Sequence, residues 1–207
     1  MSAECCHAPQ PHQNGDDPRY IRVLWLVLAI NAALFVFEIV LGLAAKSVAL
    51  QADSLDFFGD AVNYGLSLAV AGLALHQRAR AVLFKGISMG LFGLWVVGSA
   101  IWHLAQGTVP EAFTMGWVGI VALVANALSF GLLWAYRSGD SNMRSVWLCS
   151  RNDVIGNVAV LLAAIGVFGT SRGWPDVVVA VIMGALATQG SWVVTKTASR
   201  EMAETGA

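Results

Sequence analysis

Two pairs of residues, each four positions apart, are the part of this sequence best suited to chemistry. Asp56 and Asp60 form one pair, and Cys149 and Asp153 form the other. Residues four apart share one face of a helix. Three carboxylates and a thiol are four ligands, which suits a divalent cation with a tetrahedral preference. We therefore predict a metal site made of Asp56, Asp60, Cys149 and Asp153, provided that the two helix faces meet.

Both pairs fall in apolar surroundings, where charge is expensive. If the second apolar stretch enters from outside near Ser47, Asp56 lies about 13 Å and Asp60 about 20 Å deep in a hydrocarbon layer about 30 Å thick. Counted from the cytoplasmic side, Cys149 and Asp153 lie about 7 and 14 Å deep. Asp60 should then be level with Cys149, and Asp56 with Asp153. A carboxylate at the bilayer centre costs at least about 2.5 kcal/mol, which favours a functional role.

Four anionic groups this close cannot all be ionised in a low-dielectric site, so they must hold protons or a cation. Metal binding expels protons, and protons expel metal. The site therefore predicts exchange of metal for protons. Two plainer interpretations stay open. The acids could line an aqueous cavity or hydrogen-bond to Asn63, Asn126 and Asn157, and a buried cysteine is often only a small hydrophobic residue.

Several polar residues around the two pairs have weaker predictions. Asp53 borders the same face, as a hydrogen-bonding residue or as a participant in transport, and Asn157 is a further supporting residue. Asn31 and Glu38 are predicted to make polar contacts between helices. Asp176 follows Trp174-Pro175 at a helix start, where an acid complements the helix dipole, so we assign it a structural role.

The composition predicts an all-α membrane protein. Of 207 residues, 57% are hydrophobic and 12% are charged, and the net charge is −1, which gives no footprint for nucleic acid. Both termini are predicted to be cytoplasmic, because nine Lys and Arg, Lys85 among them, then lie inside and two lie outside. Six spans are predicted, at residues 20–43, 47–75, 82–105, 114–136, 144–168 and 175–196.

Three regions are expected along the chain. Residues 1–19 form a disordered cytoplasmic head, 20–197 form the six-helix transmembrane domain, and 198–207 form a short cytoplasmic tail. The head carries four soft ligands within eight residues, which either capture metal or belong to a solvated tail: Cys5, Cys6, His7 and His12.

The run from Ser47 to Asp60 resembles the second helix of the cation diffusion facilitator family. That helix reads Ser-x-x-Leu-x-x-Asp-x-x-(His or Asp)-x-x-x-Asp, and Ser47-Val-Ala-Leu-Gln-Ala-Asp-Ser-Leu-Asp-Phe-Phe-Gly-Asp60 meets every fixed position. The family's fifth helix carries His-x-x-x-Asp, where this chain has Cys149 and Asp153. Trp174-Pro175-Asp176 resembles the start of its sixth helix. The similarity covers roughly residues 20–197.

The resemblance implies a homodimeric exporter of zinc-like divalent cations, driven by inward proton flow, with ligands at Asp56, Asp60, Cys149 and Asp153. A cysteine at the usual histidine position favours Zn²⁺ or Cd²⁺ over Mn²⁺ or Mg²⁺. The family's C-terminal metallochaperone-like domain is expected to be missing, and the 137–143 loop has no histidine. The dimer would then depend on membrane helices. Gly86 and Gly90 permit close approach of a helix, from a second copy or from the same subunit.

The expected protein is thus a secondary active transporter rather than an enzyme, in the inner membrane of a bacterium. It would export Zn²⁺, with Cd²⁺ or Co²⁺ as further candidates and H⁺ as the coupling ion. The alternatives are a metal-binding scaffold or sensor and a passive cation channel. An intramembrane aspartyl protease using Asp60 and Asp153 is disfavoured, because Phe57 breaks the required Gly-x-Gly-Asp pattern.

Overall fold

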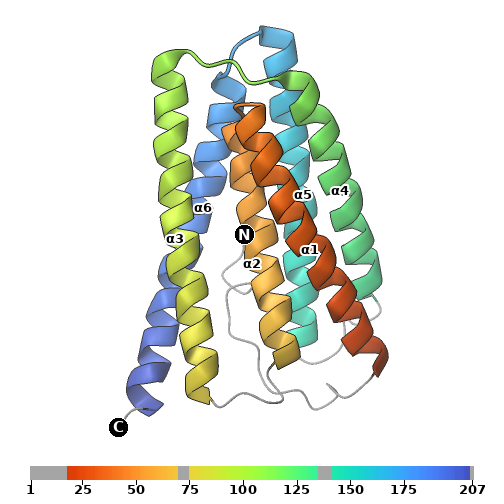
Figure 1. Cartoon of the computed structure of the whole chain (residues 1–207), viewed down its shortest axis with the longest axis vertical. Helices are drawn as coiled ribbons and strands as arrows, with labels where there is room; N and C mark the ends of the chain where they lie inside the picture. The colour runs from red at the N-terminus through yellow and green to blue at the C-terminus, as the bar shows by residue number, and fades with distance from the viewer. Residues whose placement is uncertain (1–17, 70–74, 135–140, 206–207) are drawn as a thin grey trace.

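The chain folds into an upright bundle of helices (Figure 1). The computed structural model describes residues 18–69, 75–134 and 141–205. These residues form α1 (Pro18–Ala44), α2 (Val48–Ala69), α3 (Leu75–Gln106), α4 (Ala112–Leu133), α5 (Ser141–Thr170) and α6 (Trp174–Thr205). In Figure 1, α1 begins and α6 ends at the same end of the bundle, as an even number of crossings requires. The prediction of an all-α membrane protein is confirmed.

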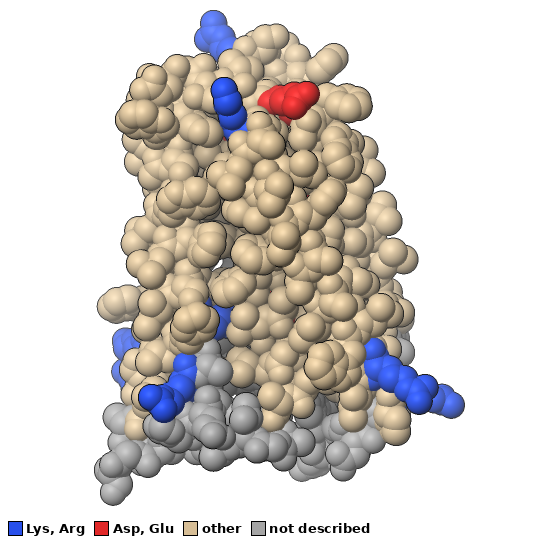
Figure 2. Space-filling model, viewed as in Figure 1, with Lys and Arg blue, Asp and Glu red and all other residues tan. Residues whose placement is uncertain are grey.

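Among the described residues, five helical segments are long and apolar enough to cross a membrane: Pro18–Ala44, Val82–Gln106, Ala112–Leu133, Asp153–Thr170 and Trp174–Arg200. Helix α2 does not reach that apolarity, since Asp53, Asp56 and Asp60 interrupt it. Figure 2 shows charged side chains gathered toward the two ends of the molecule, with a broad uncharged band between them. The band matches a bilayer, and the polar helix is sheltered inside it.

Two helices extend well beyond the predicted spans. The connection expected at 76–81 is helical, because α3 begins at Leu75, and α6 continues to Thr205 rather than ending near 196. Low hydropathy marks where a segment leaves the hydrocarbon, but it does not end a helix. Neither segment contains the glycine or proline that would end one.

Helix α2 is the central element of the bundle. It packs against α1, α3, α5 and α6, while the most extensive contacts join α3 with α6, α1 with α2 and α4 with α5. The first half of α2 is almost entirely buried, from Val48 through Leu55. Every acid on α2 therefore faces protein on at least one side.

Small residues hold α3 against α6 within the one chain. A Cβ added at Gly86 would lie 2.6 Å from Thr195 Oγ1, and one at Gly90 would lie 2.5 Å from Ser191 Oγ. The Ser191 hydroxyl also donates to the Gly86 carbonyl at 2.6 Å. The glycines are thus occupied by α6, so the prediction that Gly86 and Gly90 carry the contact between two copies is wrong. The spacing was correctly interpreted as close helix approach, but the partner lies in the same subunit.

Asp176 joins the start of α6 to the start of α2. Its carboxylate accepts from Ser47 Oγ at 2.6 Å, from the Val48 amide at 2.9 Å and from the Ala49 amide at 3.0 Å. The side chain is 1% exposed. The structural role predicted for Asp176 agrees with these contacts, although the amides it satisfies belong to α2 and not to its own helix.

Candidate metal-binding site

Two buried carboxyl groups meet between α2 and α5. The side chains of Asp60 and Asp153 lie within hydrogen-bonding distance of each other, and they are only 6% and 8% exposed. Asp56, one turn earlier on α2, is partly exposed. Carboxylates in contact repel unless a proton or a cation lies between them. The contact brings together two of the predicted ligands, which lie 93 positions apart in the sequence.

The register between α2 and α5 differs from the prediction. Asp60 was expected level with Cys149, but it contacts Asp153, one turn further along α5. A Cβ at Gly156 would lie 3.9 Å from Asp56 Oδ2, so Asp56 is close to the next turn of α5. The predicted depths assumed that both helices start at the predicted span ends and lie along the membrane normal. A shift of one turn between α2 and α5 is enough to place Asp153 beside Asp60 instead of Cys149.

A buried chain of amides and acids continues from the site toward the other end of α2. Asn126 Nδ2 donates to Asn157 Oδ1 at 3.1 Å, and Asn157 Nδ2 donates to Asp53 Oδ2 at 2.7 Å. Glu38, which is 0% exposed, interacts electrostatically with Asp53, but neither of its buried carboxyl oxygens has a hydrogen-bond partner among the described residues. Asp53 and Asn157 thus hold α2, α4 and α5 together, and the hydrogen-bonding interpretation of Asp53 is favoured.

The two polar residues of α1 behave differently. Glu38 faces Asp53 of α2 electrostatically, but both of its buried oxygens lack a hydrogen-bond partner among the described residues, so the predicted polar contact between helices stays a prediction for this residue. Asn31 instead donates to the Val27 carbonyl of its own helix at 2.8 Å, so the prediction of a contact between helices is wrong for this residue. An amide side chain in an apolar helix can satisfy itself on the preceding turn, which removes its need for a partner helix.

Some of the predicted ligands lie outside the residues that the structure describes. Cys149 belongs to α5, but its side chain is outside the described residues, as are Cys5, Cys6, His7 and His12. Among the described side chains, no three acids, cysteines or histidines converge as a complete metal shell. The described part of the site is therefore the Asp60–Asp153 contact, with Asp56 one turn away.

Two further residues of the site were missed from the sequence. The Tyr64 hydroxyl donates to Asp60 Oδ2 at 2.8 Å, and its position four residues after Asp60 was the available signal. Lys85 was counted among the cytoplasmic charges, but it is 3% exposed and donates from Nζ to Asn63 Oδ1 at 2.5 Å. Its signal was a single cation early in an apolar stretch. Without Lys85, the positive-inside count is eight against two, which keeps its direction.

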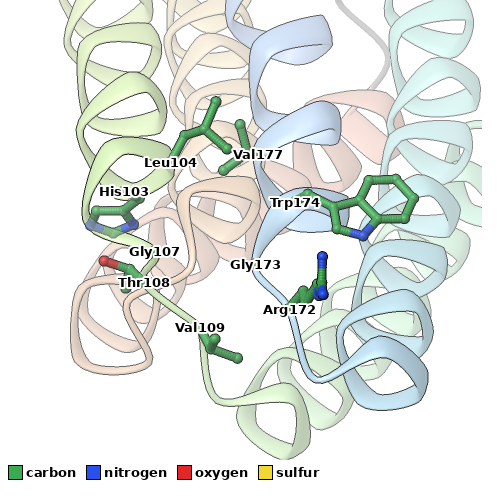
Figure 3. Close-up of a pocket in the computed structure, with 9 residues that line it drawn as sticks. All are labelled: His103, Leu104, Gly107, Thr108, Val109, Arg172, Gly173, Trp174 and Val177. Carbon is green, nitrogen blue, oxygen red and sulfur yellow. The ribbon is translucent and has the colours of Figure 1, made fainter.

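A cavity of about 250 Å³ opens at the other end of the bundle, where the α3–α4 and α5–α6 connections meet. Figure 3 shows His103 and Thr108 on one side of it, and Arg172 and Trp174 on the other. Its lining contains no acid, and Arg172 contributes a positive charge. This cavity is therefore poorly suited to a metal cation and is distinct from the acidic site in the core.

Comparison with known proteins shows consistent similarities. The family model described as the cation efflux transmembrane domain matches residues 24–203. The chain is 24% identical over 207 residues to the metal cation efflux system protein CzcD of Cupriavidus metallidurans, covering 93% of this chain and 64% of the relative. It is 23% identical to the cadmium, cobalt and zinc/H(+)-K(+) antiporter of Bacillus subtilis (89% and 63% covered) and to the zinc transporter ZitB of Escherichia coli (88% and 63%). The chain thus spans less than two thirds of these relatives' length.

Proposed function

Because the chain belongs to the cation diffusion facilitator family, whose transmembrane domain covers residues 24–203, we propose that it exports divalent metal cations from the cytoplasm in exchange for protons. The observation that carries the proposal is the contact of two buried carboxyls, Asp60 and Asp153, between α2 and α5. The names of the relatives support Zn²⁺ as the cargo, with Cd²⁺ and Co²⁺ as further candidates.

The proposed ligands are Asp56, Asp60, Cys149 and Asp153. In the empty site, a proton between Asp60 and Asp153 relieves their repulsion. Metal arriving from the cytoplasm displaces protons and takes their place. A rocking motion then turns the site outward, where protons return and release the metal, as in other carriers with a site near the bilayer midplane. Tyr64 keeps Asp60 oriented in both states through its hydrogen bond.

The setting of this transport is also a proposal. The positive-inside bias favours a cytoplasmic position for both chain termini, and the bacterial relatives support the plasma membrane. A homodimer is implied by the resemblance, through a surface other than the glycines of α3. Cys5, Cys6, His7 and His12 are proposed to collect metal before it enters the site.

Metal uptake into proteoliposomes tests the proposal. The wild type is compared with Asp60→Asn and Asp153→Asn, which keep the side-chain shape, and with Glu111→Gln as the matched control, because Glu111 is an exposed acid at the opposite end. Zn²⁺ uptake should rise when the liposome lumen is acidic, because protons then leave as metal enters. Zn²⁺ uptake should be abolished in Asp60→Asn and in Asp153→Asn, and it should be retained in Glu111→Gln.

Each other outcome points to a different protein. Flux that ignores the pH gradient would identify a passive channel. Metal binding without flux would identify a scaffold or sensor. Normal coupled flux in Asp60→Asn or Asp153→Asn would show that the exporter uses another site.

A further inference from the structure

Lys85 is a buried cation that the proposed transport cycle does not use. It lies on α3 inside the apolar segment Val82–Gln106, with a side chain that is 3% exposed. A lysine within a membrane helix is costly and marks function unless a partner compensates it. Its hydrogen-bond partner is Asn63 Oδ1 at 2.5 Å, which is an uncharged amide. An amide orients an ammonium group but does not neutralise it.

The charge of Lys85 acts instead on the acids of α2. Both Asp56 and Asp60 interact electrostatically with it. The path of the side chain explains why: a Cβ added at Gly59 would lie 3.9 Å from Lys85 Cε. Gly59 lies between the two aspartates along α2, so the lysine stem passes beside the turn that carries them. The ammonium is thereby held beside the site, with Asn63 fixing its position one turn beyond.

Charge counting shows what this position does. Asp56, Asp60 and Asp153 carry three negative charges when ionised, a Cys149 thiolate would add a fourth, and Lys85 cancels one of them. The site with its lysine is therefore closer in charge to one divalent cation than the same site without it. Without the lysine, the loaded carboxylates would keep a net negative charge inside the membrane, and the metal would be held more tightly.

We propose that Lys85 is the resident countercharge of the transport site, which lowers the net negative charge of the site and keeps metal binding weak enough for release. The inference rests on the proposed function and assigns to it a positioned charge that contacts no metal. Removal of the charge should tighten metal binding and slow metal release. Damage to the fold would instead weaken binding and transport together.

The test measures the KM and maximal rate of Zn²⁺ uptake in proteoliposomes, together with the Zn²⁺ dissociation constant of the detergent-purified full chain by chelator competition. Lys85→Met removes the charge and keeps the length of the side chain, while Lys85→Arg keeps the charge. Lys196→Met is the matched control, because Lys196 is an exposed lysine of α6. Asn63→Asp is a second variant, which leaves Lys85 in place and cancels its charge with a new carboxylate.

Lys85→Met should lower the KM and the dissociation constant by about tenfold or more, with a lower maximal rate, since one charge beside a divalent ion is worth that much even at high effective dielectric. Asn63→Asp should shift both constants the same way, and Lys85→Arg and Lys196→Met should match the wild type. An unchanged or higher KM in Lys85→Met overturns the proposal. Where Lys85→Met does not reach the membrane, an unchanged KM in Asn63→Asp overturns it. The wild type and Asp60→Asn are measured alongside. If the wild type shows no Zn²⁺ flux, the transport function is refuted. If the wild type transports Zn²⁺ normally but Lys85→Met leaves the KM and the dissociation constant unshifted, only the role of Lys85 is refuted.

Discussion

Replacing Gly86 with alanine should loosen the α3–α6 pair. The added Cβ would lie 2.6 Å from Thr195 Oγ1 and 3.2 Å from the Thr195 backbone nitrogen. A hydroxyl can rotate away, but the backbone nitrogen cannot, so the helices must separate. The hydrogen bond from Ser191 to the Gly86 carbonyl would stretch as they do. Overpacking of this kind costs about 1–3 kcal/mol.

Gly98 on the same helix provides the matched control. A Cβ added there meets nothing within 4 Å. Both substitutions gain the same helix propensity, up to about 1 kcal/mol, so their difference isolates the packing. For a chain of this size, 1 kcal/mol shifts the unfolding midpoint by about 2–4 °C. Gly86→Ala should therefore unfold roughly 2–12 °C below Gly98→Ala.

The assay is thermal unfolding in detergent, followed by tryptophan fluorescence. Adding Thr195→Ala to Gly86→Ala should recover only part of the loss, because it removes the contact with the hydroxyl but leaves the contact with the Thr195 backbone nitrogen. Equal midpoints for Gly86→Ala and Gly98→Ala would refute the assignment of the glycines to the α3–α6 contact. A loss that depends on protein concentration would return them to an interface between copies.

Two other substitutions test separate parts of the structure. Asp176→Asn should lower the unfolding midpoint by about 2–12 °C, because the new amide group would face a buried N–H donor of α2 and the folded state would lose about 1–3 kcal/mol of stability. Glu111→Gln, at an exposed acid, should leave the midpoint unchanged. Equal midpoints for the two variants would contradict this prediction. Cys149→Ser should raise the KM for Cd²⁺ more than that for Zn²⁺ in proteoliposome uptake, because a thiolate prefers the softer ion; equal changes would remove the sulfur from the ligand set.

The acids of the site could be predicted because charge in an apolar helix is conspicuous. Asp60 and Asp153 were identified from residue type and helical spacing, and they meet in the structure. Their register could not be predicted, because depth was counted from span ends that polar helix extensions obscure. A shift of one turn between α2 and α5, which the span ends alone do not fix, replaces Cys149 with Asp153 beside Asp60.

Lys85 was missed for a different physical reason. A lysine early in an apolar stretch commonly extends toward the interface, so its sequence position fits an ordinary boundary residue. Its true direction depends on the rotation of α3, which is set by the contact of Gly86 and Gly90 with α6. The same spacing shows that some helix approaches closely but not which one. Both errors share this cause, since the partner of α3 is a property of the assembled bundle.

Asp176 also decides when α2 becomes complete during synthesis. The bond between Ser47 and Asp176 joins residues 129 positions apart. At a translation rate of about 5–20 residues per second, roughly 6–26 seconds separate the emergence of the two partners. For that time the described helix that contains no candidate membrane span has no carboxylate for its first amides. The last helix to be made is thus the one that completes the second, and assembly of this bundle is a long-range event although each helix forms locally.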